Sequence, residues 1–303
     1  MNVFGDMLET YAERNPRGNA VYYGTDKKVT WKELNNRVNS LANALLDLGI
    51  KKGDKGIVMF HNSPEFLESV CALQKIGAIP TEMNYRFVPR EIEYQTNHSD
   101  SKVFLTEDLW QENVKKAKQN MPKVENYIVS GKAGEFLNYE DLIKEYPSKD
   151  PGIEVSINDA ASLNYTGGTT GWPKGVVMTY NTFISEVKGA LGLLLRDAPQ
   201  LKIPKIKLPI PFGSVIAEVI GSDFVNSFIH SKVIKRVLAS PELLELIFQR
   251  LLPTMRGRLP FLELRFLNPA PLFHVGTFTS VVEGIWMQCG MPLVLNTNPR
   301  FDP

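Results

Sequence analysis

The stretch GIVMFHNSPEFLESVCALQKIGAIPTEM, residues 56–83, indicates a strand, a helix and a second strand in direct succession. The short apolar run at 56–60 is typical of a buried strand. Ser63 and Pro64 then predict the start of a helix, because a proline at the first helical position gives up no hydrogen bond. A second apolar run follows at 78–83. Two neighbouring strands joined through a helix run parallel, so this stretch predicts a βαβ unit.

The same alternation extends in both directions along the chain. Upstream, Thr30 and Glu33 have the spacing of a capping box, which predicts the start of a helix. Gly49 is a stop signal and predicts the end of that helix. Apolar residues recur there at helical spacing, namely Trp31, Leu34, Val38, Leu41, Leu45 and Leu48. Downstream we expect a helix, a strand and a helix at 89–98, 102–106 and 107–118. This pattern predicts an α/β fold with mostly parallel sheets flanked by helices.

Composition excludes several classes of protein. The 303 residues carry a formal net charge of +1, which gives no field to attract nucleic acid. Cys71 and Cys289 are the only cysteines, too few for a disulfide framework, and we expect both to be buried thiols. Neither a secretory signal nor a run of about 18 apolar residues is visible in the sequence. We therefore expect a cytoplasmic protein without a transmembrane span.

Residues 165–176, YTGGTTGWPKGV, carry the clearest chemical signal. Strands are predicted on either side of them, at 159–165 and 176–180. Glycines permit backbone angles that turn successive N–H groups toward one anion, and hydroxyls and a lysine add further donors. The glycines and donors are Thr166, Gly167, Gly168, Thr169, Thr170, Gly171 and Lys174. This composition predicts a polyphosphate-binding loop, and the alternative is a flexible hairpin without a ligand.

The loop differs from two better-known phosphate loops. A kinase-type P-loop has Ser or Thr directly after its lysine and continues into a helix, whereas Gly175 and a predicted strand follow Lys174. No G-x-G-x-x-G spacing of a dinucleotide fold is present either. Trp172 occupies a variable position, and the sequence assigns it no role.

The loop resembles the phosphate-binding signature of the adenylate-forming, or AMP-binding, superfamily, Ser/Thr-Gly-Thr-Thr-Gly-x-Pro-Lys-Gly. Gly168 takes the place of the usual middle glycine of that signature, and the resulting TGG variant is similar to that of bacterial fatty-acyl-CoA synthetases. Two further blocks agree in order, at 72–106 and at 269–278 (PAPLFHVGTF). The first contains Asn84, Tyr85 and Arg86, for which we expect a turn anchored by the arginine rather than a chemical role. The resemblance spans nearly the whole chain.

The resemblance implies an acid–thiol ligase of fatty acid metabolism. In this family a carboxylic acid attacks ATP with the help of Mg²⁺, giving an acyl-adenylate that coenzyme A converts to a thioester. Thr166, Thr169, Thr170 and Lys174 would hold the β- and γ-phosphates, with the three loop glycines shaping the site. The acyl pocket would be lined by Phe273, His274 and Gly276, with His274 near the carboxylate. A purely structural role for His274 is the alternative. No metal ligand and no further catalytic residue is assigned.

The resemblance also implies a layout for the chain, as a partial AMP-binding large domain over 1–303. We expect βα layers at 1–187, a basic, proline-rich excursion at 188–265 and the acyl-pocket block at 266–303. A helix is predicted in the excursion from Ser240 and Pro241. Its apolar stripe either packs on the main body or belongs to a lid or a membrane-surface patch.

The family's later blocks have no counterpart after the closing FDP of residues 301–303. They hold a magnesium glutamate, a ribose aspartate and, in a small mobile domain, a catalytic lysine. We therefore expect a chain truncated before the small domain and inactive alone, with a separately encoded C-terminal half as a candidate partner. The alternatives are a non-catalytic nucleotide- or acyl-binding module, and a fragment of an aryl-acid or amino-acid adenylating enzyme. Acid chain length and oligomeric state are not encoded in any motif.

Overall fold

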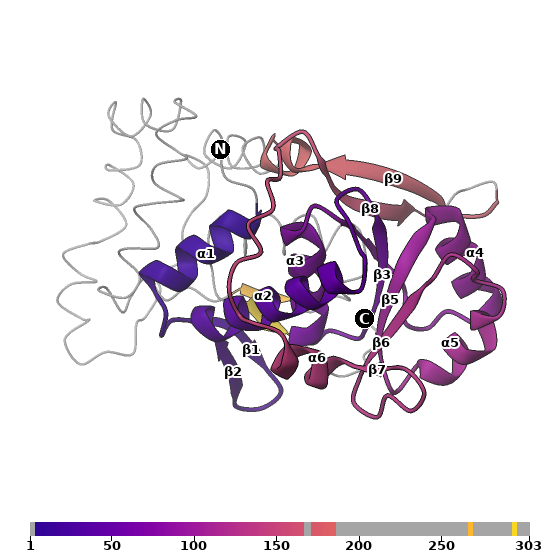
Figure 1. The fold of residues 1–303 in the computed structure, drawn as a ribbon, viewed down its shortest axis with the longest axis horizontal. Coiled ribbons are helices and arrows are strands. Elements are labelled where there is room, and N and C mark those ends of the chain that lie inside the picture. Colours follow the sequence, from indigo (N-terminus) through magenta and orange to yellow (C-terminus); the bar gives the residue numbers. More distant parts are fainter. Residues whose placement is uncertain (1–3, 167–170, 186–265, 269–292, 296–303) are drawn as a thin grey trace, which may run out of the picture.

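A computed structural model describes residues 4–166, 171–185, 266–268 and 293–295. Its centre is a sheet of five strands that all run parallel (Figure 1). In spatial order they are β4 (Ile79–Glu82), β3 (Lys55–Met59), β5 (Ser101–Glu107), β6 (Asn126–Ser130) and β7 (Leu137–Asn138). The predicted parallel α/β fold is confirmed.

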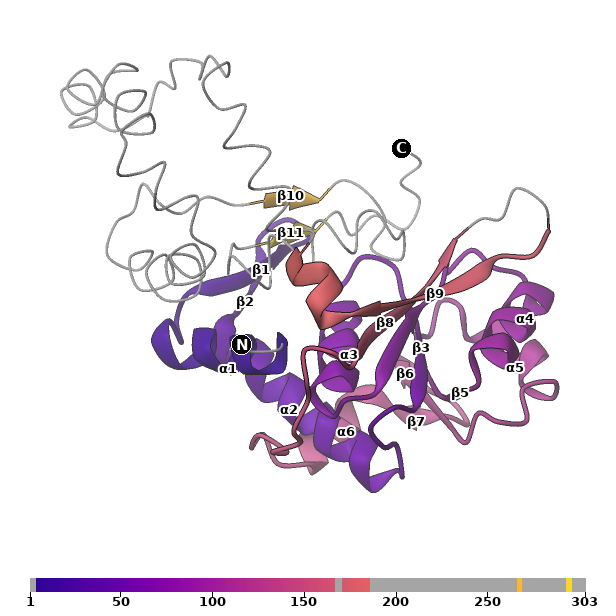
Figure 2. The ribbon, with the colours of Figure 1, turned by 90° about the horizontal axis from the view of Figure 1, so that it is seen from above.

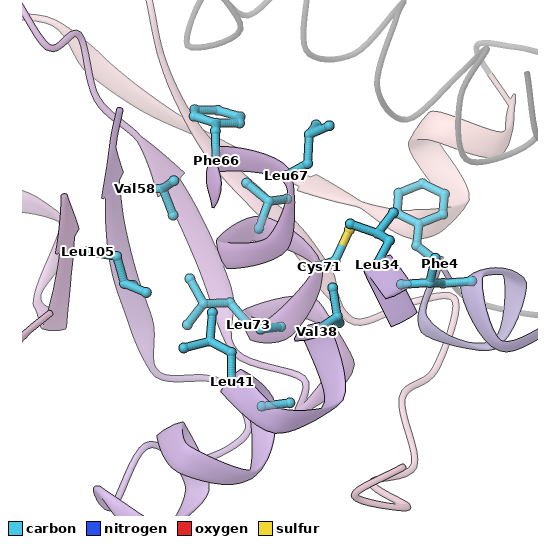
Figure 3. Close-up of a cluster of buried hydrophobic side chains, with 14 of the residues drawn as sticks. Phe4, Leu34, Val38, Leu41, Val58, Phe66, Leu67, Cys71, Leu73 and Leu105 are labelled. Atoms are coloured by element: carbon cyan, nitrogen blue, oxygen red, sulfur yellow. The ribbon is translucent and has the colours of Figure 1, made fainter. Parts of the chain in front are cut away.

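Helices cover both faces of this sheet, as the sequence predicted (Figures 1 and 2). On one side lie α2 (Trp31–Asp47), α3 (Pro64–Lys75) and α6 (Tyr139–Glu145), and on the other α4 (Pro89–Ser99) and α5 (Gln111–Lys118). Side chains alternate between the two faces along each strand. Val58 and Leu105 meet Leu73 of α3 in one buried cluster (Figure 3), whereas Ile57 and Phe104 belong to the other.

The capping box predicted at the start of α2 is present. Thr30 Oγ1 accepts a hydrogen bond from the Glu33 N–H at 3.2 Å, and Glu33 Oε2 accepts one from the Thr30 N–H at 2.9 Å. Further along α2, Arg37 reaches Glu68 of α3 at 2.7 Å and Glu140 of α6 at 2.6 Å. Charge pairing thus ties together the helices of this face.

A second, smaller sheet joins distant parts of the chain. It has the order β10 (Phe266–Asn268), β11 (Leu293–Leu295), β1 (Asn19–Tyr23) and β2 (Lys27–Thr30). β11 pairs in parallel with both β1 and β10, and β1 and β2 form an antiparallel pair after α1 (Phe4–Arg14). The sequence analysis predicted none of α1, β1, β2, β6, β7 and α6.

Two predicted boundaries were wrong. The helix expected at 107–118 begins only at Gln111, because Glu107 completes β5 and its carboxylate accepts hydrogen bonds from the Trp110 indole and the His61 N–H. The strand expected at 176–180 runs over Lys174–Thr179 instead. A helical turn starts at Tyr180, where Thr179 Oγ1 accepts the N–H of Thr182.

Other predictions fall only partly within the described residues. Cys71 is buried as expected, whereas Cys289 lies outside the described ranges. The excursion at 188–265, with the helix expected from Ser240 and Pro241, also lies outside them. Among the helices that the structure describes, none has the length and apolar character needed to cross a membrane.

Candidate functional site

The predicted phosphate loop joins two paired strands. β8 (Ala160–Thr166) and β9 (Lys174–Thr179) form an antiparallel hairpin, so the prediction of a strand entering and a strand leaving the loop is confirmed. Thr166 lies opposite Lys174 in the register, at the loop end of the hairpin. Gly171 is also described, whereas Gly167, Gly168, Thr169 and Thr170 lie outside the described residues.

Two chemical groups at this loop end, those of Thr166 and Lys174, are available to a ligand. Thr166 and Lys174 are both exposed. Within the described part of the chain, no hydrogen bond or ion pair reaches the Lys174 ammonium. Gly171 has φ +155°, a backbone conformation that side chains disfavour. An unpaired ammonium opposite a hydroxyl, next to a glycine turn, is suited to binding phosphate oxygens.

The backbone of the hairpin fits closely beneath an aromatic ring. Gly175 pairs with Tyr165 across the strands. A Cβ added to Gly175 would lie 2.9 Å from Leu163 Cδ1 and 3.3 Å from Tyr165 Cζ. Only a glycine therefore lets both side chains lie over β9 at this point, directly after Lys174.

Helix α4 lies beside the loop end of the hairpin (Figures 1 and 2). Trp172 stacks on Tyr94 of α4 with ring centroids 4.5 Å apart, and the Tyr94 hydroxyl donates a hydrogen bond to the Pro173 carbonyl at 2.9 Å. An open pocket of about 600 Å³ is lined here by Arg90, Glu93, Tyr94, Asn97, His98 and Trp172. The contact between Trp172 and Tyr94 was not predicted from the sequence, although Tyr94 and His98 share a face of the predicted helix at spacing i, i+4.

A comparison with known protein families matches a segment that includes the β8–β9 hairpin. Residues 8–203 match the family described as AMP-binding enzyme. The chain belongs to the AMP-binding enzyme family. The predicted membership is thus confirmed.

Curated relatives differ in the acids that their names state. The chain is 30% identical over 239 residues to a medium-chain-fatty-acid–CoA ligase of Ectopseudomonas oleovorans, covering 74% of this chain and 44% of the relative. It is 31% identical over 199 residues to the 2,3-dihydroxybenzoate-AMP ligase of Bacillus subtilis, covering 64% and 36%. Acetyl-coenzyme A synthetase of Methanothrix thermoacetophila is 30% identical over 205 residues, covering 60% and 31%. The chain spans less than half the length of these relatives.

Solved structures share the fold of this AMP-binding chain. The anthranilate CoA ligase AuaEII, in complex with anthranoyl-AMP, superimposes with a TM-score of 0.67 at 20% identity, covering 98% of this chain and 45% of that one. The N-terminal domain of FACL13 from Mycobacterium tuberculosis gives the same TM-score at 20% identity, covering 100% and 58%. The fold is therefore that of the first part of these larger chains.

Residues 84–86 lie within the block at 72–106 that resembles the family, and they form a turn. The Asn84 side-chain oxygen accepts the Arg86 N–H at 2.9 Å, and the Arg86 guanidinium lies 5.6 Å from the Tyr85 ring centroid. Tyr85 in turn stacks on Trp110 at 5.0 Å. The predicted turn is present, but the Asn84 side chain closes it, and the arginine packs on the tyrosine.

The predicted acyl-pocket residues Phe273, His274 and Gly276 lie outside the described residues, between β10 and β11. Their assignment stays a prediction. Among the described residues, no group of three or more His, Cys, Asp or Glu side chains could hold a metal ion.

One buried carboxyl group lies on β4, the strand that packs against β8 of the hairpin. Glu82 at the end of β4 is buried, and neither of its carboxyl oxygens has a hydrogen-bond partner among the described residues. Burial raises the pKa of this carboxyl to about 8. The group is therefore mostly protonated at neutral pH.

Proposed function

We propose that this chain is part of the large domain of an ATP-dependent, AMP-forming acid–thiol ligase. It would activate a carboxylic acid, most simply a fatty acid, to an acyl-adenylate and then to an acyl-CoA thioester. The observation that carries the proposal is the β8–β9 hairpin, where an exposed Lys174 pairs with Thr166 at the base of a glycine-rich loop. Family membership supports the same chemistry.

The proposed reaction has two halves. An oxygen of the acid's carboxylate attacks the α-phosphorus of ATP, and pyrophosphate leaves with the electrons of the broken P–O bond. Coenzyme A then attacks the acyl carbonyl through its thiol sulfur, and AMP leaves as the thioester forms. Lys174 and the loop donors would hold the β- and γ-phosphates and offset the charge that builds on the departing pyrophosphate. Mg²⁺ would be bound together with ATP and would offset part of the charge of its phosphates.

The proposal of a fatty acid as substrate rests on a feature of the loop sequence and on the name of one relative. The second glycine of the loop resembles fatty-acyl-CoA synthetases, and a named medium-chain-fatty-acid ligase is among the relatives. In this proposal Phe273, His274 and Gly276 form the pocket wall, with His274 facing the carboxylate. The 2,3-dihydroxybenzoate-AMP ligase relative favours an aryl acid as the second candidate.

We further propose the layout of βα layers at 1–187, an excursion at 188–265 and the pocket block at 266–303. Since the chain spans 31% to 44% of the curated relatives, turnover of the whole reaction is proposed to need a further C-terminal segment. Location in the cytoplasm also stays a prediction.

The test compares the 303-residue chain with a fusion that adds the downstream part of the Ectopseudomonas oleovorans ligase. Pyrophosphate release is measured with ATP, Mg²⁺ and either fatty acids of graded length or 2,3-dihydroxybenzoate. We expect release from the fusion only, and with fatty acids. Lys174→Ala should slow it by roughly one to three orders of magnitude, the range for losing a preorganised charge donor. Lys149→Ala, at an exposed position after α6, is the matched control.

Three outcomes count against the proposal. Equal rates in the Lys174→Ala and Lys149→Ala fusions would show that the hairpin does not bind the phosphates. Preference for the aryl acid would replace the substrate assignment. Robust release by the 303-residue chain alone would contradict the need for a further segment.

A further inference from the structure

Three contacts hold the outgoing side of the phosphate loop to α4. Trp172 and Tyr94 stack with an interplanar angle of 30°. The Arg90 guanidinium carbon lies over the Trp172 ring, 5.2 Å from its centroid, which is within cation–π range. The Tyr94 hydroxyl bonds the carbonyl of Pro173, the residue directly before Lys174. The backbone that leads into Lys174 is therefore fixed from outside the hairpin.

The incoming side is held by the same helix. His98 Nδ1 lies 2.7 Å from the Tyr165 hydroxyl, and the two rings meet edge to face with centroids 5.6 Å apart. His98 also stacks on Tyr94 at 5.4 Å. Rings therefore follow one another without a break from Tyr165, directly before Thr166, to Trp172 at the other end of the loop. We call Arg90, Tyr94, His98, Tyr165 and Trp172 the aromatic clamp.

Along β8 the hairpin packs against β4 of the body, and its loop end contacts α4. The opposite end of β8 has its own contact, where the Gln74 side chain of α3 donates to the Ala161 carbonyl at 3.0 Å. The clamp is the corresponding contact at the loop end. Holding both ends of a short loop removes conformational freedom that a ligand would otherwise have to remove on binding.

We infer that the aromatic clamp positions the phosphate loop, holding Thr166 and Lys174 in the geometry that binds a polyphosphate. This inference rests on the proposed function, that the loop binds the phosphates of ATP. When only a fraction of molecules has the competent loop geometry, the apparent dissociation constant rises by the inverse of that fraction. Loosening the clamp should therefore weaken polyphosphate binding without removing any group that touches the ligand.

Binding is measured on the full 303-residue chain by titration calorimetry with MgATP and, separately, with inorganic pyrophosphate. Tyr94→Phe keeps the ring and removes one neutral hydrogen bond, so we expect about two- to tenfold weaker binding. Trp172→Leu removes the stack and the cation–π contact, and roughly tenfold weaker binding is expected. Tyr146→Phe is the matched control, because it removes a hydroxyl that bonds Asp47 at 2.6 Å on another part of the surface.

Hydrogen–deuterium exchange provides a readout that needs no ligand. In Tyr94→Phe and Trp172→Leu, the amides of β8 and β9 near the loop should exchange faster, whereas those of β3 and β5 should keep the wild-type rate. Tyr146→Phe should change neither. Trp172 is 45% exposed, so its replacement does not open a core cavity, and both variants are expected to fold.

The two readouts separate the clamp from the proposed function. If exchange and affinity in both clamp variants equal those of the wild type, the clamp does not position the loop. Faster exchange with unchanged affinity would also overturn the inference, since loop order would then not govern binding. If the wild-type chain binds neither MgATP nor pyrophosphate, the proposed function is wrong, and exchange alone then decides whether the clamp holds the loop.

Discussion

Lys75 and Lys174 place the same ammonium group in opposite surroundings. Lys75 is 4% exposed at its side chain, and its Nζ lies 2.5 Å from Glu9 Oε1, 3.3 Å from Asn35 Oδ1 and 3.3 Å from Asp150 Oδ2. Lys174 is exposed and has no such partner in the described ranges. Burying an ammonium costs so much hydration energy that partners must offset it, whereas an exposed unpaired one keeps its charge for a ligand.

The comparison extends to the regions that carry these lysines. In the body, formed by the parallel sheet and its helices, charged groups such as Arg37 and Glu68 are paired and hold elements together. In the hairpin, Thr166 and Lys174 are exposed. We therefore expect a division between the two regions: substitutions in the body change the free energy of unfolding, and substitutions at the hairpin change phosphate binding. Each prediction below tests this division.

The largest effect is expected from Arg37→Ala. Arg37 donates to both oxygens of Glu68, whose side chain is 1% exposed, and to Glu140. Among the described residues, its loss leaves the buried Glu68 with only the Tyr139 hydroxyl as a hydrogen-bond donor, at 3.0 Å. Breaking a buried pair in this way costs about 3–5 kcal/mol, measured as the free energy of unfolding in urea.

The control for Arg37→Ala is Lys123→Ala, which breaks an exposed pair with Asp100. Its effect on the urea midpoint should be much smaller. Arg37→Ala molecules that remain folded should bind pyrophosphate as the wild type does. Weaker binding by the folded fraction would show that body and hairpin are not separate.

A pH-dependent effect is expected at Glu82. Burial raises the folded-state pKa of this carboxyl from 4.5 to about 8. Between these values the folded state keeps a proton that the unfolded state has lost, so the free energy of unfolding falls as pH rises through this window. The cost is about 1.4 kcal/mol per pH unit, on the order of 3 kcal/mol at pH 7.

Glu82→Gln should remove this slope. The variant and the wild type should have similar melting temperatures near pH 4.5, and the variant should melt higher at pH 8. Glu145→Gln, at an exposed position, should follow the wild type at every pH. Parallel melting curves for Glu82→Gln and the wild type would mean that Glu82 gains a partner or water in solution.

Local signals were sufficient to predict much of the body. The strands near 56–60 and 78–83 and the cap at Thr30 depend on residues within a few positions of each other, and the structure confirms them. The failure at Glu107 has a tertiary cause, because its carboxylate is bonded by His61 from another strand end. No local pattern reveals such a partner.

Pairings between distant segments could not be predicted for the same reason. The parallel pairing of β1 with β11 joins Val21 to Leu293, and nothing in either segment specifies the other. At the site, composition alone located the hairpin and the lysine. The contact between Tyr94 and Trp172 was not predicted, because it depends on where α4 packs. The sequence shows that both residues are aromatic but not that they meet.

The smallest effect is expected from Thr30→Ala at the start of α2. The variant loses the hydroxyl that accepts the Glu33 N–H, so one N–H at the helix start loses its partner. Loss of such a cap costs about 1 kcal/mol. Thr30→Ser keeps the acceptor and should restore most of the lost unfolding free energy, which urea titration resolves.

This small change is the strictest test of the division, because it damages the body without unfolding it. α2 packs on α3, and α3 reaches β8 through Gln74, so a mechanical route from Thr30 to the hairpin exists. If the body and the hairpin are energetically separate, Thr30→Ala should leave both pyrophosphate affinity and β8–β9 exchange at wild-type values. If the exchange rate of the hairpin amides rises in proportion to the lost free energy of unfolding, these amides exchange only when the whole body unfolds. The aromatic clamp would then act within one cooperative unit, and the contrast between Lys75 and Lys174 would describe exposure alone.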